Sequence, residues 1–184
     1  MVYVAILLDR SHSMFSEEIG GMSKYMAGVR GIEEFLGNIG VSSVNVYVGL
    51  FLFPPSNLIN VLNGFYLPGF VPATKIHELR GYRAGSGTPI GRALINVVNM
   101  CPGCRPLVVK LISDGEWNEP GNPNDRVAEL NQLEGIVGGG NIRIDLINIA
   151  GVPDVDFIEF IVGHGGRVYS PMSINDVASA LADL

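Results

Sequence analysis

The chain has 184 residues, of which 47% are hydrophobic and 16% are charged. This length and composition predict one globular domain with a buried core and argue against disorder. The net charge of −6 and the scattered basic residues argue against nucleic-acid binding through phosphates. No apolar run approaches the roughly 18 residues of a membrane span, and the first residues lack the features of a signal peptide. We therefore expect a cytoplasmic protein that binds neither membrane nor nucleic acid.

Short apolar runs alternate with stretches of helical periodicity along the chain. This alternation predicts a mostly parallel sheet covered by helices on both faces, an α/β fold. Apolar residues recur every three or four positions in the helical stretches, and Pro54-Pro55 ends the second strand. In chain order, we predict strand 2–8, helix 22–39, strand 44–53, short strand 58–62, loop 64–73, helices 75–80 and 89–100, strand 107–112, loop 115–124, helix 125–137, strand 142–149, helix 154–162, strand 167–169 and helix 174–184.

Oxygen-bearing side chains follow two of the predicted strands and one glycine-rich turn. Asp9, Ser11 and Ser13 come directly after the first strand, Thr88 follows the turn 85–87, and Asp114 follows the strand 107–112. Open α/β sheets bind ligands at the carboxyl ends of their strands. Carboxylate and hydroxyl oxygens suit Mg²⁺, Mn²⁺ or Ca²⁺ better than Zn²⁺. The alternative is that these residues are ordinary loop residues or helix N-caps.

The three segments, in this order, resemble the metal-ion-dependent adhesion site (MIDAS) of the von Willebrand factor A (vWA) family. Met14 after the second serine and Gly165-Gly166 before a short late strand are further matches. The resemblance covers nearly the whole chain. It implies a single vWA domain over residues 1–184 with a three-layer α/β/α, Rossmann-like fold. It also implies that the strand 58–62 is an antiparallel edge strand.

The resemblance also implies a function. In the family, both serines coordinate the ion directly and the threonine joins them when a partner is bound. The two aspartates act largely through water or by hydrogen-bonding the ligands. Carried over, Ser11, Ser13 and Thr88 are direct donors, Asp9 and Asp114 supply charge, and Mg²⁺ is the expected ion, with Mn²⁺ or Ca²⁺ as alternatives. These donors would leave one coordination position of the ion open. An Asp or Glu side chain of a protein partner would fill that position.

Two features of the family bear on the partner and on movement. Intracellular prokaryotic vWA proteins of similar size work with AAA+ ATPases of the MoxR or chelatase type, or within tellurium-resistance-type stress systems. The first context makes such an ATPase a candidate partner. In adhesive members, ligand binding shifts the last helix. The same coupling here would make the predicted helix 174–184 the moving element.

Three residues beside the expected site are candidates for contacts with a partner. His12 lies between the two serines and would titrate near neutral pH, or be a solvated side chain without a role. Trp117 is either a binding hot spot or a packing residue on the neighbouring loop. Glu116 would repel a second carboxylate or bind a basic flank of the partner.

Two other functions compete with the binding module. One is a Mg²⁺-dependent hydrolase or phosphotransferase, and the other is a structural or assembly protein with a vestigial metal site. We expect no enzymatic activity, because Asp9 matches no Asp-x-Asp phosphatase pattern and the turn before Thr88 lacks the lysine of a phosphate-binding loop. Cys101 and Cys104 follow a predicted helix instead of starting one, which argues against redox catalysis. A local disulfide and buried thiols both remain open.

Overall fold

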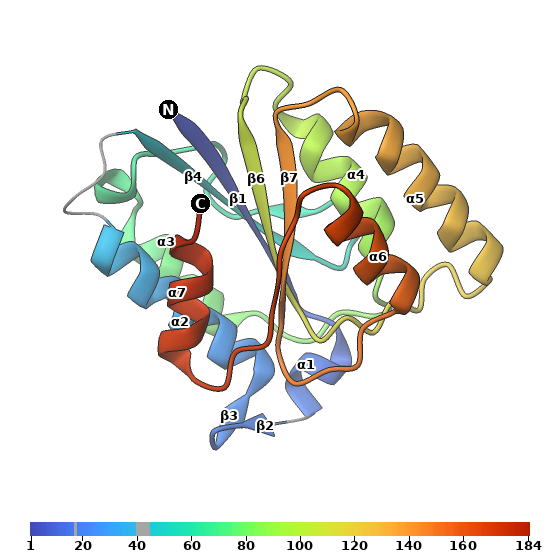
Figure 1. The fold of residues 1–184 in the computed structure, drawn as a ribbon. Helices are drawn as coiled ribbons and strands as arrows, with labels where there is room; N and C mark the ends of the chain where they lie inside the picture. The colour runs from blue at the N-terminus through green and yellow to red at the C-terminus, as the bar shows by residue number, and fades with distance from the viewer. Residues whose placement is uncertain (17, 40–44) are drawn as a thin grey trace.

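A central six-stranded sheet organises the chain, in the order β5-β4-β1-β6-β7-β8 (Figure 1). The computed structural model describes residues 1–16, 18–39 and 45–184. Neighbouring strands run parallel, except that β5 is antiparallel to β4 at the edge. The strands are β1 (Val2–Asp9), β4 (Val46–Phe53), β5 (Ile59–Asn60), β6 (Leu107–Ser113), β7 (Ile142–Asn148) and β8 (Val168–Tyr169).

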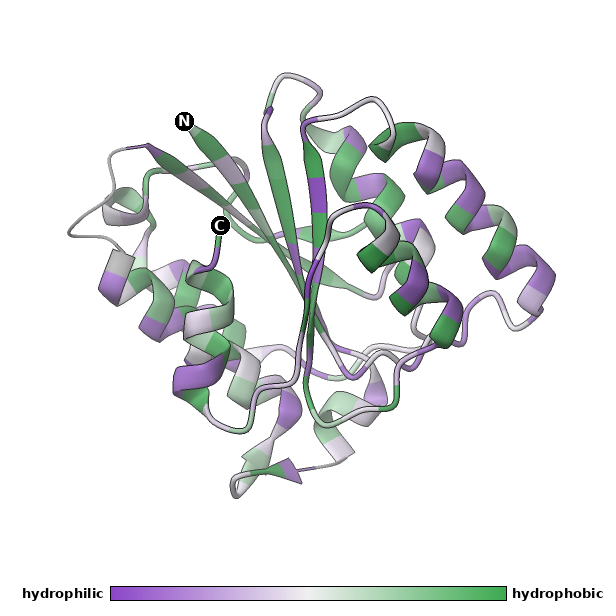
Figure 2. Ribbon diagram, viewed as in Figure 1, coloured by the Kyte–Doolittle hydropathy of each residue, from purple (hydrophilic) through white to green (hydrophobic). Residues whose placement is uncertain are grey.

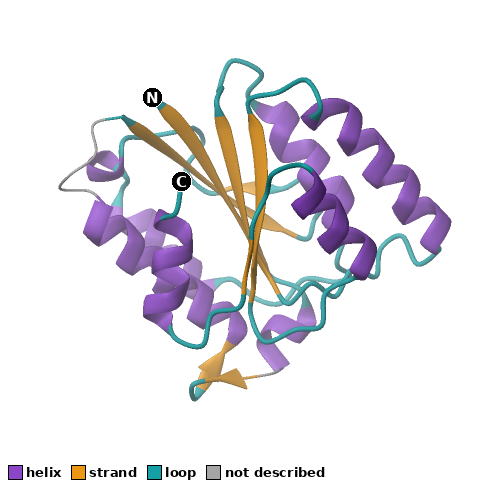
Figure 3. Cartoon of the chain, viewed as in Figure 1, coloured by secondary structure: helices purple, strands orange, loops and turns teal. Residues whose placement is uncertain are grey.

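Helices cover both faces of this sheet and give the three layers (Figures 1 and 3). One face carries α2 (Lys24–Ile39), α3 (Ala73–Glu78) and α7 (Ile174–Ala182), and the other carries α4 (Ile90–Met100), α5 (Pro123–Val137) and α6 (Val155–Gly163). The short helix α1 (His12–Ser16) and the hairpin of β2 (Glu18–Ile19) and β3 (Met22–Ser23) follow β1. Short 3₁₀ helices span Pro68–Phe70 and Leu79–Gly81.

The central strands are apolar on both sides because helices cover both sides. In β1, Val4, Ile6 and Leu8 pack into the core beneath α2 and α7, whereas Ala5 and Leu7 pack into the core beneath α4 and α5. Figure 2 shows the same pattern as mostly hydrophobic colour along the middle strands, interrupted by hydrophilic bands. This two-sided burial produces the continuous apolar runs that predict a parallel sheet.

The predicted α/β architecture with an antiparallel edge strand is confirmed. The helix predicted from residue 22 begins instead at Lys24, because Met22–Ser23 pair with Glu18–Ile19 in the hairpin. Gly20 and Gly21 turn this hairpin with positive φ angles of 61° and 82°. The predicted start of the second strand, Val44, lies outside the described residues.

The register of the sheet decides where the functional side chains meet. Leu8 of β1 lies beside Ile112 of β6, so the two strands end together at Asp9 and Ser113. Because β1 and β6 are parallel neighbours, the segments that follow them leave the sheet at the same edge. Among the described residues, no helix is both long and apolar enough to span a membrane.

Candidate metal centre

Three segments meet at the carboxyl ends of β1 and β6. The segment after β1 carries Ser11 and Ser13, and Asp114 follows the last residue of β6. The glycine-rich turn is fastened beside them, because the amide of Gly85 donates to the Arg10 carbonyl at 2.7 Å and Gly85 forms a β-bridge with Ser11. This turn leads to Thr88 at the start of α4. The fold therefore assembles all three parts of the motif at one edge of the sheet.

Asp9 is fully buried, and both of its carboxylate oxygens accept hydrogen bonds. Oδ1 accepts from the amide of Ser11 at 2.7 Å, and Oδ2 accepts from the hydroxyl of Ser113 at 2.7 Å. The Ser113 hydroxyl in turn accepts from the amide of Gly115 at 2.9 Å. Burial raises the pKa of Asp9 to about 7, although the hydrogen bonds from Ser11 and Ser113 oppose this rise. Asp9 thus ties the two loops together.

Asp114 is the second fully buried carboxylate. Its Oδ2 accepts a hydrogen bond from the Ser13 hydroxyl at 2.5 Å, and its Oδ1 accepts from the amide of Glu116 at 3.2 Å. The Ser13 and Ser11 hydroxyl oxygens are 3.5 Å apart. The Nζ of Lys24, at the start of α2, lies 3.6 Å from Asp114 Oδ2. Two serines, one carboxylate and one ammonium therefore share a single cluster.

The turn after Asp114 is packed too tightly for side chains larger than glycine. A Cβ on Gly151, in the loop between β7 and α6, would lie 1.7 Å from the Asp114 carbonyl oxygen. Gly115 has a φ of 75°, and a Cβ there would lie 2.6 Å from Pro153. The β7–α6 loop therefore lies directly on the Asp114 turn and holds it in place.

The donor chemistry of the cluster fits a hard divalent cation. Ser11 and Thr88 are each 2% exposed and supply hydroxyl oxygens, as does Ser13, while Asp9 and Asp114 supply the negative charge. Mg²⁺, Mn²⁺ and Ca²⁺ prefer such oxygens. Within residues 1–16, 18–39 and 45–184, no group of three or more His, Cys, Asp or Glu side chains could hold a metal. A metal site in the described part of the chain would thus depend on hydroxyl donors.

The three candidate partner contacts have different environments. His12 and Glu116 are exposed beside the cluster. Trp117 is only 6% exposed: its Nε1 donates to the Glu119 carbonyl at 2.9 Å, and its ring packs edge-on against Phe157. The hot-spot interpretation of Trp117 is therefore corrected to the packing one, because the indole fills the core beside α4 instead of facing a partner.

Three residues of the site were missed in the sequence. Ser113 links the two loops, Asn118 accepts the Thr88 amide at 2.8 Å through its Oδ1, and Lys24 pairs with Asp114. The role of Ser113 could have been predicted from the sequence, because a hydroxyl at the end of a strand that pairs with β1 lies near Asp9. The roles of Lys24 and Asn118 could not, since one polar residue outside a motif resembles any solvated side chain.

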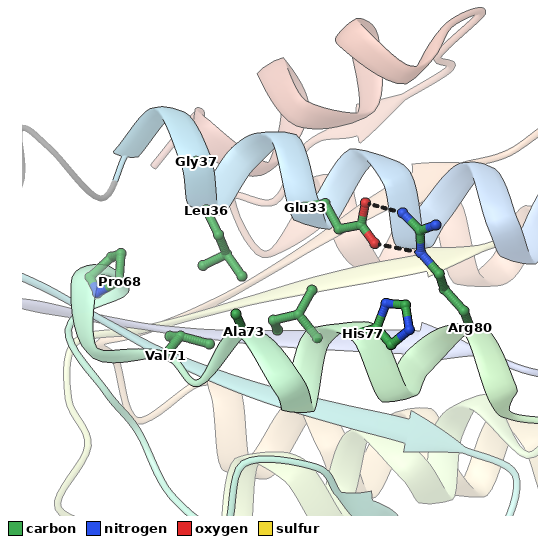
Figure 4. A pocket seen from close by; sticks show the side chains of 9 residues that line it. Glu33, Leu36, Gly37, Pro68, Val71, Ala73, His77 and Arg80 are labelled. Carbon is green, nitrogen blue, oxygen red and sulfur yellow. Dashed lines mark hydrogen bonds and ion pairs between the residues drawn. The ribbon is translucent and has the colours of Figure 1, made fainter.

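A separate groove lies between α2 and α3 (Figure 4). It has a volume of about 430 Å³ and an apolar floor that includes Leu36, Val71 and Ile76. At one side, Arg80 donates to both carboxylate oxygens of Glu33, at 2.9 and 2.7 Å. None of the candidate metal ligands lines this groove, so the groove is separate from the candidate metal site.

Comparisons with known proteins identify the architecture. No protein-family model matches the sequence, and no curated protein matches it. The structure is similar to a von Willebrand factor type A protein from Catenulispora acidiphila, with a TM-score of 0.74 and 16% identity over 98% of this chain. It is also similar to the SpRpn10 VWA domain, with a TM-score of 0.71 and 14% identity over 96% of this chain. The fold is that of a vWA domain.

The extent of the match differs between these neighbours. The chain spans only 41% of the Catenulispora protein but 93% of the SpRpn10 domain. The protein BatB from Bacteroides thetaiotaomicron, with a TM-score of 0.68 and 17% identity, is matched over its whole length and over the whole of this chain. The vWA fold thus accounts for the full described chain. Identities this low establish the fold alone, so any shared activity or partner is a matter for proposal.

Proposed function

We propose that this vWA domain is a protein-binding module that grips an Asp or Glu side chain of its partner through a divalent cation. Asp9, Ser11, Ser13, Thr88 and Asp114 would hold that cation, with Mg²⁺ first and Mn²⁺ or Ca²⁺ as alternatives. The observation that carries the proposal is the hydrogen-bonded cluster that joins Ser11 to Asp9 and Ser13 to Asp114 across two neighbouring strands. The vWA fold of the chain supports a role in protein interaction.

The donor set explains why a partner would be needed. Mg²⁺ prefers six oxygens and would attract an anionic oxygen from outside. Ser11, Ser13 and Thr88 offer neutral hydroxyls, and the carboxylate of Asp9 already accepts from Ser11 and Ser113. The site therefore leaves positive charge on a bound divalent ion incompletely neutralised. A carboxylate of the partner would complete both the charge and the coordination.

The surface beside the cluster suggests what flanks that carboxylate. The β7–α6 loop lies on the Asp114 turn and displays Val152, which is 89% exposed, and α6 begins with Val155, which is 68% exposed. Exposed apolar side chains next to a polar site are typical of interaction surfaces. We therefore infer an acidic partner residue with apolar neighbours. His12 and Glu116 remain candidates for further contacts, and an AAA+ ATPase is the candidate partner suggested by the sequence resemblance.

The test is capture of binding partners from a source lysate in Mg²⁺ and in EDTA. Asp114→Asn keeps the shape of the side chain but removes its charge, and Asp125→Asn, an exposed acid on α5, is the matched control. We expect a partner that is held by the wild type and the control in Mg²⁺. The same partner should be lost in EDTA and by Asp114→Asn. Equal capture under all conditions would move the function away from this cluster.

The competing functions make different predictions for the same protein. A Mg²⁺-dependent hydrolase or phosphotransferase would turn over a generic phosphoester, and Asp9→Ala would abolish that turnover. An assembly protein with a vestigial site would oligomerise equally with and without metal. Our proposal predicts neither phosphoester turnover nor metal-independent oligomerisation.

A cytoplasmic location is part of the proposal and has its own test. The structure joins Cys101 and Cys104 in a disulfide, and such bonds are rare in reducing compartments. Alkylation of the thiols in freshly lysed source cells would distinguish the cases. Free thiols would support a cytoplasmic location, whereas a disulfide formed in the cell would contradict it.

A further inference from the structure

Lys24 places a positive charge inside the proposed metal site. It is the first residue of α2, and Figure 1 shows that this end of α2 lies beside α1 and the hairpin β2–β3. Its side chain is 2% exposed, and its Nζ lies 3.6 Å from Oδ2 of the fully buried Asp114. Lysine is almost never fully buried unless its charge is paired. The ion pair with Asp114 is not the only interaction that Lys24 makes.

The same Asp114 oxygen serves two groups. Oδ2 accepts the hydroxyl of Ser13 at 2.5 Å and faces the Lys24 ammonium at a distance longer than a normal hydrogen bond. The contact with Lys24 is therefore an ion pair that leaves lone pairs of the carboxylate available. A divalent cation bound to Ser13 or supported by Asp114 would lie within a few ångströms of this ammonium. Like charges at such distances repel strongly where water is excluded.

The second buried lysine of the chain provides a contrast. Lys110 on β6 donates to Asp145 at 2.7 Å and to the Asp183 carbonyl at 2.6 Å. This lysine lies among side chains that hold the C-terminal segment to the sheet, away from the hydroxyl cluster. Lys24 differs because its partner carboxylate belongs to the cluster proposed to bind metal.

We propose that Lys24 is an internal counter-cation of Asp114 that competes with the divalent ion. This inference rests on the proposed function, since it concerns the same site. Lys24 would keep the cluster assembled when no metal is bound. It would also make the site bind metal more weakly than the same oxygens would without a neighbouring ammonium. Metal occupancy would then depend on the partner carboxylate, which adds the negative charge that Lys24 offsets.

The test is a titration of the purified protein with Mg²⁺ by calorimetry, repeated with Mn²⁺ by electron paramagnetic resonance. Lys24→Met removes the charge and keeps much of the side-chain volume. The matched control is Lys75→Met, at a lysine on α3 whose side chain is 40% exposed. We expect Lys24→Met to bind either ion about tenfold or more tightly than the wild type. Lys75→Met should bind like the wild type.

The outcomes separate this inference from the proposed function. If the wild type and Lys24→Met bind metal with equal affinity, or the variant binds more weakly, Lys24 does not compete and the inference alone fails. If no variant binds metal at all, both the inference and the proposed metal site fail. Binding detected only in Lys24→Met supports both.

Thermal unfolding in EDTA and in saturating Mg²⁺ gives a second readout. Lys24→Met leaves Asp114 buried without this charge partner, so its unfolding temperature should fall in EDTA and recover in Mg²⁺. The wild type should respond much less to Mg²⁺. If Lys24→Met does not fold, Lys24→Gln tests the loss of charge and Lys24→Arg keeps it. Tighter metal binding by Lys24→Gln than by Lys24→Arg supports the inference, and equal binding overturns it.

Discussion

At the scale of single residues, the candidate site depends on a hydroxyl that is outside the sequence motif. Ser113 is fully buried, and its Oγ donates to Asp9 and accepts from the amide of Gly115. It therefore connects the end of β1 with the turn that orients Asp114. The five motif residues supply the oxygens, whereas Ser113 fixes how the two loops face each other.

Replacing Ser113 with alanine should weaken the site without removing a proposed ligand. We expect the free energy of unfolding to fall by about 1–3 kcal/mol, because Asp9 loses a hydrogen bond in a buried position. The affinity for Mg²⁺ should fall as well, since Asp9 and the Asp114 turn lose their link. Urea unfolding and calorimetric titration measure the two effects. Ser179→Ala, at an exposed serine on α7, is the control, and a Ser113→Ala variant indistinguishable from it would refute this role.

At this scale the sequence predicted which oxygen-bearing segments come together, but not the hydrogen bonds among them. The segment 9–13, Thr88 and Asp114 could be found because each follows a strand or a glycine-rich turn. Lys24 could not, because only the three-dimensional fold brings the start of α2 to Asp114. Trp117 was ambiguous for a similar reason: a tryptophan next to a site motif is compatible with both a buried and an exposed ring.

At the scale of elements, periodicity found the long elements and missed the short ones. The strands β1 and β6 consist mostly of apolar residues, and the helices have room for several turns of a repeating pattern. The helix α1 has five residues, and β2 and β3 have two each. Segments this short contain hardly more than one period of a helix or a strand, so no repeating pattern can be recognised in them. Their positions follow from the packing around them.

The contact between α2 and α7 depends on a glycine. A Cβ added to Gly31 of α2 would lie 2.3 Å from Cγ1 of Val177 in α7, whereas a Cβ added to Gly37 would meet nothing within 4 Å. Gly31 therefore permits the close approach of the two helices. Gly37 gives the same helix flexibility without a packing role.

Alanine at these two positions should have opposite effects. Gly31→Ala should lower the free energy of unfolding by about 1–3 kcal/mol through overpacking, despite the better helix propensity of alanine. Gly37→Ala should raise it by about 0.5–1 kcal/mol, because alanine loses less backbone entropy than glycine. Chemical denaturation of both variants measures the difference. Stabilisation by Gly31→Ala would mean that α7 does not pack as closely as described.

This packing also bears on the expected movement of the last helix. Beyond α7, the Asp183 carbonyl accepts from Lys110 at 2.6 Å and from Arg143 at 2.9 Å, and the Asp183 carboxylate accepts from Tyr169 at 2.6 Å. A shift of α7 on partner binding stays a prediction. Any such shift would have to break or carry along these contacts.

At the scale of the whole molecule, the net charge would give a bound metal ion a specific role in binding an acidic partner. The chain has a net charge of −6, so it repels an acidic partner at long range. A divalent ion at the carboxyl edge of the sheet would reverse that preference locally. The parallel order of β1 and β6 places the cluster in the middle of that edge, beside exposed apolar residues of the β7–α6 loop. Fold, charge and surface are thus consistent with metal-bridged recognition of a carboxylate.

The central claim is that the hydroxyl and carboxylate cluster binds a divalent cation, and a Mn²⁺ titration followed by electron paramagnetic resonance tests it most directly. The protein should be stripped of metal and titrated beside the double variant Ser11→Ala/Ser13→Ala and the control Ser179→Ala. We predict one Mn²⁺ bound by the wild type and by the control, and affinity lower by about tenfold or more in the double variant, which loses two direct donors. The absence of bound Mn²⁺ in both the wild type and Lys24→Met would contradict the account. A wild type that binds Mn²⁺ no more tightly than the double variant does would contradict it as well.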